Sequence, residues 1–364
     1  MPREPEVSGV RASLNDAAVA ALATRVKAAA ESAMPLQICG GGSKAFYGRA
    51  IQGELLDTRD CAGIVAYEPT ELVITARAGT SLIDIEAVLA AQDQMLGFEP
   101  PHFGGGATVG GVVASGLSGP ARPYHGAVRD FVLGVDLLDG RGELLSFGGQ
   151  VMKNVAGFDV SRLLAGSLGS LGVIVQVSLR VLPRPRVQRT LVWRLSPSAA
   201  RPRMAELALA PWPITAMCYD GEFLRLRAAG SDEAVSHAIA QLAPDVESDD
   251  LDYWRALRDL RLPFFTDDPR PVWRMSVPPV APDLAGLGPV LHDWGGAQRW
   301  LHAVADDPTV RAHAAEFGGH ATCFSLCDAP FAAPAAPLRA LMQRLKRALD
   351  PQGIFNPGRL YEWL

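Results

Sequence analysis

A glycine-rich stretch decides the fold of this chain: residues 102–119 read HFGGGATVGGVVASGLSG. Seven of these eighteen residues are glycine, and Val109, Val112, Val113 and Leu117 are interleaved with them as packing residues. The stretch is therefore expected to be built into the protein rather than to act as a flexible linker. Glycine lets a backbone approach a ligand closely, because it has no side chain to hold the ligand away. Close packing of one backbone on another is the alternative explanation.

Another glycine loop lies about sixty residues upstream, where a predicted strand over residues 35–39 runs into Gly40-Gly41-Gly42-Ser43. Because it comes earlier in the chain, it is called the first loop, and residues 104–111 are called the second. Successive backbone N–H groups of such a loop can form an anion-binding nest. The loop has neither the G-K-[ST] ending of a P-loop nor the G-x-G-x-x-G spacing of a Rossmann unit. Two separate nests suit an extended, doubly charged pyrophosphate, with the hydroxyls of Thr108 and Ser118 as further donors. Taken alone, the first loop is equally well explained as a structural turn.

A third motif, KNVAGFD at residues 153–159, leads to GSLGSLGVI at residues 166–174. Lys153 could bring positive charge close to an electron-rich ring or an anionic substrate. A solvated surface lysine explains the same residue equally well.

Hydrophobic periodicity and capping residues predict the elements of the first half of the chain. LGVIVQVSLRVL at residues 171–182 is the clearest strand, and DGRG at residues 139–142 predicts a hairpin turn. Asn15 or Asp16 could cap the first helix, and Ser81 the second. The predicted helices cover 14–33, 82–92 and 160–168, and the remaining strands cover 63–67, 72–76, 131–138 and 143–147.

Composition changes at PRPR, residues 183–186, which we take as a domain boundary. Beyond it the glycine-rich loops stop, and predicted strands (188–195, 214–219, 223–228) alternate with helices (201–210, 232–242). A long amphipathic helix is predicted over residues 333–349. The chain thus reads as α+β, with one domain over 1–185, a cap domain over 186–335, and a C-terminal helix and tail over 336–364.

Composition excludes several classes of protein. The 364 residues carry a net charge of -5 without a basic stripe, so a nucleic-acid footprint is absent. About 18 consecutive apolar residues would be needed to span a membrane, and the sequence has no such run. The first residues lack the apolar segment of a secretory signal, and five cysteines without an export signal suggest a reduced, cytoplasmic protein.

Four stretches resemble the FAD domain of the vanillyl-alcohol-oxidase/PCMH flavoprotein superfamily, and within it the E-type FAD-binding subunits of bacterial glycolate oxidases. They are residues 107–143, 147–185, 293–301 (DWGGAQRWL) and 350–361 (DPQGIFNPGRLY). The resemblance implies a PCMH-type FAD-binding domain of two α/β subdomains and an α+β cap domain, with the tail returning to the FAD domain.

The resemblance also implies which residues bind FAD. The first loop would hold the pyrophosphate, the second the ribityl chain and pyrophosphate, and residues 172–174 the adenine. The implied cofactor-binding residues are Gly40, Gly41, Gly42, Ser43, Lys44, Gly104, Gly105, Gly106, Ala107, Thr108, Gly110, Gly111, Ala114, Gly116, Ser118, Arg129, Asp130, Val132, Gly172, Val173, Ile174 and Asn356.

The sequence departs from the family pattern in two places. Lys44 stands where some relatives carry a histidine that is linked to the flavin, so we expect non-covalent FAD. Relatives that oxidise 2-hydroxy acids directly often carry a histidine-rich metal motif in the cap. The seven histidines here are scattered, so no metal site is expected, and whether this subunit itself oxidises substrate is left open.

Within the resemblance, the implied function is oxidation of glycolate or a similar 2-hydroxy acid to the 2-oxo acid. Electrons would pass to an iron-sulfur subunit, in a complex with a second FAD-containing subunit. The expected location is the cytoplasm, at the inner face of the membrane through those partners. The alternatives are a non-catalytic FAD-binding relay or scaffold subunit, and a stand-alone sugar or alditol oxidase.

Two further motifs are candidates for chemistry. Trp294 and Arg299 form a polar-aromatic cluster that could line the flavin or a substrate carboxylate, since arginine suits bidentate carboxylate binding. A turn held by a packing tryptophan is the alternative. Cys323 and Cys327 are too few for a four-thiolate cluster, and buried thiols explain them better. The sequence assigns no catalytic residue and leaves Lys153, Trp294 and Arg299 as candidates.

Overall fold

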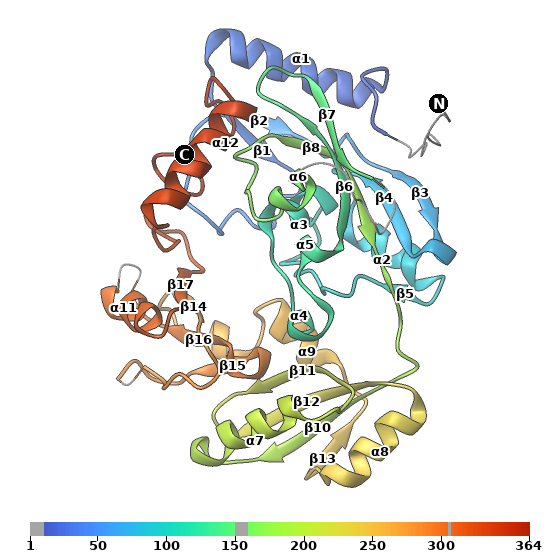
Figure 1. The fold of residues 1–364 in the computed structure, drawn as a ribbon, viewed down its shortest axis with the longest axis vertical. Coiled ribbons are helices and arrows are strands. Elements are labelled where there is room, and N and C mark those ends of the chain that lie inside the picture. The colour runs from blue at the N-terminus through green and yellow to red at the C-terminus, as the bar shows by residue number, and fades with distance from the viewer. Residues whose placement is uncertain (1–10, 150–158, 285, 305–306) are drawn as a thin grey trace, which may run out of the picture.

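Two antiparallel sheets organise the chain, one in each half (Figure 1). The computed structural model describes residues 11–149, 159–284, 286–304 and 307–364. The first sheet has five strands in the order β3-β4-β8-β6-β7. Their bounds are Ile64–Glu68 for β3, Val73–Arg77 for β4, Val132–Leu138 for β6, Leu144–Gly148 for β7 and Val173–Arg180 for β8.

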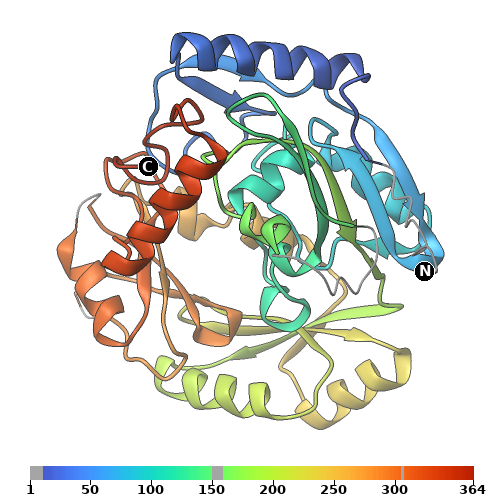
Figure 2. The same cartoon turned by 45° about the horizontal axis from the view of Figure 1, so that its top comes forward.

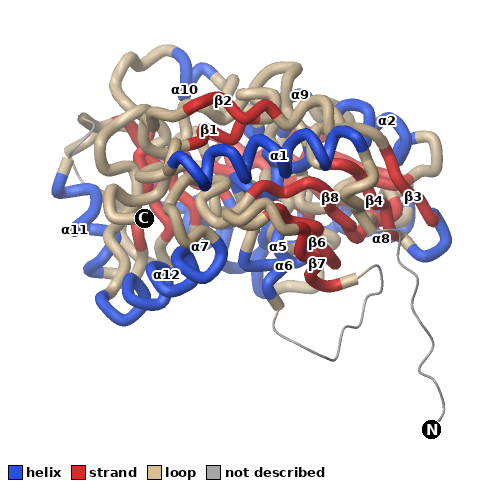
Figure 3. The backbone as a smooth tube through the Cα atoms, turned by 90° about the horizontal axis from the view of Figure 1, so that it is seen from above, coloured by secondary structure: helices blue, strands red, loops and turns tan. Residues whose placement is uncertain are grey.

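The central strand β8 is covered on both faces. Val173 and Val175 pack with α1 (Ala17–Ser32), whereas Ile174 packs with α2 (Leu82–Ala90) and α3 (Val109–Ser115). Burial on both sides explains why this segment is apolar nearly throughout. Figure 3 shows α1 lying across the outer side of the sheet. The expected caps are confirmed, because Asp16 accepts hydrogen bonds from the first turn of α1 and Ser81 from that of α2.

A small parallel pair, β1 (Leu36–Cys39) and β2 (Glu54–Asp57), stands beside this sheet and leads straight into the first glycine loop. Short elements complete the domain. They are the 3-10 turn η1 (Pro69–Glu71), β5 (Gln94–Met95) paired with β9 (Leu182–Pro183), α4 (Arg122–His125), α5 (Val128–Phe131) and α6 (Val160–Leu163).

The second sheet has eight strands in the order β13-β10-β12-β11-β15-β16-β14-β17, and all its pairs are antiparallel. The bounds are Val187–Arg194 for β10, Ile214–Tyr219 for β11, Phe223–Gly230 for β12, Val246–Ser248 for β13, Val272–Ser276 for β14, Leu291–Asp293 for β15, Gln298–His302 for β16 and His320–Cys323 for β17.

Helices lie on both faces of the cap sheet. Helices α7 (Pro197–Leu209) and α8 (Asp232–Leu242) pack on the strands around β12, and α11 (Pro308–Glu316) packs on β14 and β17. The other face meets the first domain through α9 (Asp252–Arg258) and α10 (Pro263–Thr266). There Trp254 and Trp300 share an apolar cluster with Tyr47, Leu117 and Leu168 of the first domain.

The C-terminal helix α12 (Ala336–Leu349) brings the tail back to the first domain (Figure 2). The buried ammonium of Lys346 donates to Asp350 and to the carbonyls of Ser170 and Phe355. The last strand of the first sheet ends at Arg180 and the first strand of the cap begins at Val187. We keep the division into 1–185, 186–335 and 336–364 as a proposal.

Two predictions of local structure were wrong. The helix expected over residues 160–168 ends at Leu163, because Gly166, Leu168 and Gly169 all have positive φ and turn the chain. The glycine-rich stretch 102–119 contains a helix, α3, which Thr108 caps and Gly116 ends in the left-handed conformation. Tertiary burial of Val109, Val112 and Val113 stabilises this helix in spite of its low intrinsic propensity.

Candidate functional site

The first glycine loop presents free backbone amides. In the described part of the chain, the N–H groups of residues 40–44 donate no hydrogen bond, although the carbonyls of Gly42 and Lys44 accept bonds from later residues. Gly42 has φ 70, which an L-residue adopts only at a cost. Five consecutive unused donors at the end of a strand form the kind of concave loop that holds a phosphate.

The two glycine loops also pack directly on each other. A Cβ on Gly41 would lie 1.3 Å from the carbonyl oxygen of Gly106, and one on Gly40 would lie 2.4 Å from the hydroxyl of Thr108. A Cβ on Gly110 would lie 2.6 Å from the methyl of Ala78. The glycines therefore serve both purposes considered above: they let one backbone pack closely on another, and this packing brings the two loops to one cavity where a ligand can approach them.

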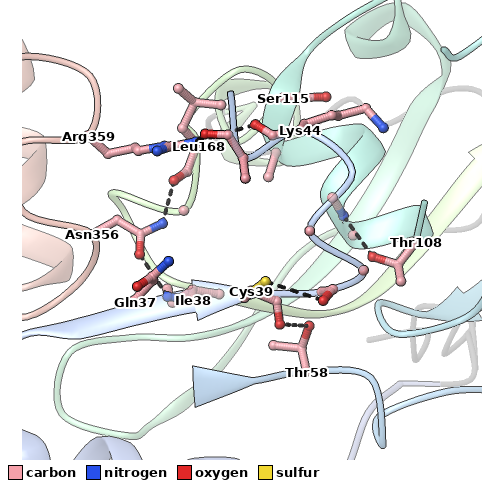
Figure 4. A pocket seen from close by; sticks show the side chains of 18 of the residues that line it. Gln37, Ile38, Cys39, Lys44, Thr58, Thr108, Ser115, Leu168, Asn356 and Arg359 are labelled. Carbon is pink, nitrogen blue, oxygen red and sulfur yellow. Dashed lines mark hydrogen bonds between the residues drawn. The ribbon is translucent and has the colours of Figure 1, made fainter. Parts of the chain in front are cut away.

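A cavity of about 320 Å³ lies between these loops, β1 and the Leu168 turn (Figure 4). Many of the residues that we expected to bind FAD line it: Gly40, Gly41, Gly42, Ser43, Lys44, Thr108, Gly110, Gly111, Ala114, Gly172, Ile174 and Asn356. Segments that are up to about three hundred residues apart in sequence thus meet around one space. The free amides, the glycine contacts and this lining fit a dinucleotide such as FAD.

Other predicted residues lie elsewhere. Gly104 and Gly105 are exposed, with nothing within 4 Å of a Cβ placed on either of them. Ser118 and Asp130 accept hydrogen bonds from nearby backbone amides, and Val173 packs under α1. The predicted residues outside the lining of this cavity are Gly104, Gly105, Gly106, Ala107, Gly116, Ser118, Arg129, Asp130, Val132 and Val173, although Gly116 and Arg129 line a neighbouring cavity.

Asn356 joins the tail to the cavity wall. Its amide oxygen accepts from the N–H of Ile38 at 2.7 Å, and its amide nitrogen donates to the carbonyl of Leu168 at 2.6 Å (Figure 4). Arg359, which sequence reasoning missed, donates to the carbonyls of Lys44, Ala45, Tyr47 and Arg49. An arginine two residues after the Asn356-Pro357 pair was the available signal, but the sequence did not show which loop it would hold.

Lys44 lies in the wall of the cavity, beside Ser43 and over the ring of Phe103. Burial lowers the pKa of this lysine to about 8, with only partial compensation from the charge of Asp259. Non-covalent binding of FAD, expected from the lysine at this position, stays a prediction.

A second cavity of about 520 Å³ adjoins the first, and Ser115 lines both. Basic side chains from both domains line it, among them Arg122 of α4, Arg274 of β14 and His320 of β17. Tyr47, just after the first glycine loop, completes this wall, and its hydroxyl accepts from Arg274 at 3.4 Å. This cavity was not expected from the sequence.

Both arginines rest on aromatic rings instead of on carboxylates. The guanidinium of Arg122 lies 4.5 Å from the ring centre of Trp294, and that of Arg274 lies 4.6 Å from the ring centre of Phe324. Within the described ranges, neither arginine forms an ion pair. Burial, together with the charge of Arg274, lowers the pKa of Arg122. Two arginines that line one space and form no ion pair within the described ranges give this cavity a character that suits an anion.

Strand alternation explains why Arg274, and not Arg299, reaches the cavity. Arg299 pairs with Met275 in the sheet, so its side chain lies on the opposite face from that of Arg274. Its five N–H donors are used by the carbonyls of Pro279, Ala281, Pro282 and Gly296 and by the carboxylate of Asp283. Arg299 therefore holds the 279–283 loop, and our expectation that it binds a substrate carboxylate has no support from the geometry.

The other two candidate catalytic residues are Trp294 and Lys153. Trp294 lines neither cavity but lies directly behind Arg122. Lys153 lies outside the described residues.

His320 lines the same cavity as the two arginines. Burial and the charges of Arg274 and Arg122 lower its pKa below the ordinary value of 6.5. The imidazole is therefore neutral at pH 7 and can accept a proton. Among the described residues, no group of three or more histidine, cysteine, aspartate or glutamate side chains could hold a metal ion.

Comparison with known proteins now identifies the family. A family model described as "FAD binding domain" matches residues 17–148, and one described as "FAD linked oxidases, C-terminal domain" matches residues 336–360. The chain is 49% identical over 341 residues to glycolate oxidase subunit GlcE of Escherichia coli (strain K12), covering 94% of this chain and 97% of that protein. The chain belongs to this GlcE family of FAD-linked oxidases. Its cofactor is FAD, as the resemblance implied.

More distant relatives agree with this family. Glycolate oxidase subunit GlcD of Bacillus subtilis is 29% identical over 120 residues, which cover 33% of this chain and 26% of that protein. The solved structure of 4-ethylphenol oxidase from Gulosibacter chungangensis has a TM-score of 0.68 at 12% identity and covers 95% of this chain and 88% of its own. That of alkyldihydroxyacetonephosphate synthase has a TM-score of 0.66 at 15% identity, covering 93% of this chain and 75% of its own. The expected α+β, PCMH-type FAD fold of the GlcE family is therefore confirmed.

Proposed function

We propose that this protein is the FAD-binding subunit of a glycolate oxidase complex, which oxidises glycolate or a similar small 2-hydroxy acid to the 2-oxo acid. The observation that carries the proposal is the second cavity. It joins the FAD cavity at Ser115 and presents the unpaired Arg122 and Arg274 beside the neutral His320. The names of the GlcE and GlcD relatives support the same activity.

The first cavity would hold the cofactor. The free amides of residues 40–44 suit the pyrophosphate, and Asn356 and Arg359 fix the loops around it. When bound, FAD would supply the two-electron oxidising capacity that takes up a hydride.

The second cavity would hold the substrate. Its carboxylate would bind the guanidinium groups of Arg122 and Arg274, each of which offers parallel N–H donors that match two carboxylate oxygens. With the carboxylate fixed, His320 would accept the proton of the hydroxyl while the α-carbon gives up its hydride. The loss of one proton and one hydride turns the alcohol into a carbonyl, so atoms and electrons balance.

Electrons would leave through partner proteins. Cys323 is buried and Cys327 lies close to it, and the described residues hold no group of metal-binding side chains. No helix in the described part of the chain has the length and apolar character needed to cross a membrane. We infer that a second flavin subunit and an iron-sulfur subunit complete the complex, in the cytoplasm and at the inner face of the membrane through those partners.

An anaerobic titration of the purified holoprotein tests this proposal. Glycolate or D-lactate should bleach the flavin absorbance of the wild-type chain. Arg274→Met should raise the substrate concentration for half-bleaching by about 10- to 100-fold, because a hydrogen bond to a charged group contributes about 1.5–3 kcal/mol. Arg203→Met, which removes a surface ion pair with Glu206, is the matched control and should leave the titration unchanged.

The titration also separates the alternatives. Bleaching only after the partner subunits are added would favour a relay subunit without its own substrate site. Bleaching by sugars or alditols, but not by 2-hydroxy acids, would favour the stand-alone oxidase.

A further inference from the structure

Arg122 belongs to a segment that cannot fix its side chain alone. It begins the single-turn helix α4, and no ion pair involving it occurs in the described ranges. An arginine side chain has four flexible torsions, and an unpaired one on a short helix loses much entropy when it is held still. A binding site that uses Arg122 therefore needs another element to fix this side chain.

Trp294 of the cap domain is that element. The guanidinium of Arg122 lies 4.5 Å from the indole ring centre. The indole N–H donates to the carbonyl of Gly119 at 3.1 Å, and the backbone N–H of Arg122 donates to the same carbonyl at 3.2 Å. One carbonyl thus aligns the backbone of the arginine with the ring beneath its side chain, across the boundary between the two domains.

The backbone at Trp294 is held in an unfavourable conformation. Trp294 has φ 53, a left-handed value that a bulky residue rarely adopts. Asp293 stabilises it by accepting from the Trp294 N–H at 2.8 Å, and Gln298 donates to the other carboxylate oxygen of Asp293 at 3.0 Å. Strained residues of this kind persist where the surrounding structure fixes them, and they gather at functional sites.

An aromatic ring holds an arginine without neutralising it. A carboxylate behind Arg122 would fix the side chain equally well, but it would compete with an incoming anion for the same charge. A ring orients the guanidinium through its face and leaves the N–H donors at its edge available. Arg274 is seated on Phe324 in the same way, so the two arginines of this cavity that form no ion pair in the described ranges share the arrangement, whereas Arg129 pairs with Asp130.

We propose that Trp294 is a positioning residue that holds Arg122 across the domain boundary, with its charge free to bind the carboxylate of the substrate. The proposal rests on the proposed function, and it gives Trp294 a role without direct contact with substrate or flavin. It also makes the anion site depend on docking of the cap against the FAD domain.

Steady-state kinetics and oxalate binding test the proposal on the holoprotein with its partner subunits. Trp294→Met removes the ring but keeps a flexible apolar side chain. It should raise the KM for glycolate and the Kd for oxalate, measured calorimetrically, about tenfold, while kcat changes less than about twofold. Trp294→Phe, which keeps a ring but loses the indole N–H, should recover most of the affinity. Phe223→Leu removes the ring beneath Arg225, away from both cavities, and should change neither constant.

A labelling experiment provides a second readout that needs no substrate. Phenylglyoxal should modify Arg122 faster in Trp294→Met than in the wild type, as followed by peptide mass spectrometry, because the guanidinium is no longer held against a ring. Equal labelling rates and an equal oxalate Kd in the two proteins would overturn the proposal. A different result would separate the two proposals. If Trp294→Met is labelled faster, but the wild type neither binds oxalate nor oxidises glycolate, the proposed function is contradicted and the contact between Trp294 and Arg122 is still supported.

Discussion

The two cavities that meet at Ser115 are built in different ways. The first is made largely of backbone: glycine loops, free amides and carbonyls that Asn356 and Arg359 bring together. The second is made of side chains that four distant segments supply, represented by Tyr47, Arg122, Arg274 and His320. A backbone site needs a particular local sequence, so it is visible as a motif. A site made of side chains needs only that residues far apart in the sequence meet.

The largest effect should follow from filling the contact between the glycine loops. Gly41→Val would place a Cβ 1.3 Å from the carbonyl oxygen of Gly106, so the loops must separate and the amides of residues 40–44 lose their arrangement. We expect the purified variant to carry less than about a tenth of the wild-type FAD, measured as flavin released by acid. Release of free FAD from the wild type would also confirm non-covalent binding.

Gly105→Val is the matched control for this variant. Gly105 lies in the other glycine loop, next to Gly106, but a Cβ there has nothing within 4 Å, so flavin content should remain at the wild-type level. Equal flavin content in Gly41→Val and Gly105→Val would show that the backbone arrangement does not hold the cofactor. Circular dichroism of both variants separates loss of cofactor from loss of fold.

In the second cavity, the next largest effect should come from His320, on the reaction rate and on its dependence on pH. Because the pKa of His320 lies below 6.5, kcat/KM for glycolate should fall as the pH drops through that value and the imidazole takes up a proton. His320→Gln should lower kcat by about 10²–10³-fold and remove this acidic limb of the pH profile. His313→Gln is the control, because His313 on α11 lies outside both cavities and bonds to the carbonyl of Pro282 and packs on the ring of Phe317. An unchanged acidic limb in His320→Gln would exclude His320 as the proton acceptor.

The smallest effect concerns the support of Trp294. Burial raises the pKa of Asp293 to about 7, far above its unfolded value of 3.8, so the folded protein binds this proton more tightly than the unfolded chain does. Stability therefore falls as the pH rises from about 4 to about 7. Asp293→Asn keeps an acceptor for the Trp294 N–H and removes the charge. It should stabilise the fold by about 1–3 kcal/mol above pH 7 and raise the thermal midpoint there.

Asp283→Asn should act in the opposite direction. His292 and Arg299 hold the pKa of Asp283 below its ordinary value, so its charge stabilises the fold at neutral pH, and this contribution is lost as the pH falls through the lowered pKa. The variant should lower the thermal midpoint at pH 7. If both asparagine variants shifted the midpoint in the same direction at pH 8, the assigned protonation of Asp293 would be wrong.

The sequence by itself determined much of the first domain. Apolar runs such as residues 173–180, the caps Asp16 and Ser81, and the glycine loops depend on interactions within a few residues of one another, so their pattern is visible along the chain. Local patterns did not predict the helix at residues 109–115, because burial of three valines stabilises it in a glycine-rich sequence.

Only the tertiary structure decided which charged residues face the second cavity. Arg274 and Arg299 both lie on short strands of the cap, and the alternation of side chains places one in the cavity and the other against the 279–283 loop. No local pattern shows which face of a strand will be covered by another domain. Likewise, Trp294 was a candidate from its sequence neighbours, but its place behind Arg122 depends on the docking of the cap. Contacts between domains join residues 172 positions apart, and such contacts leave no mark in the sequence around either residue.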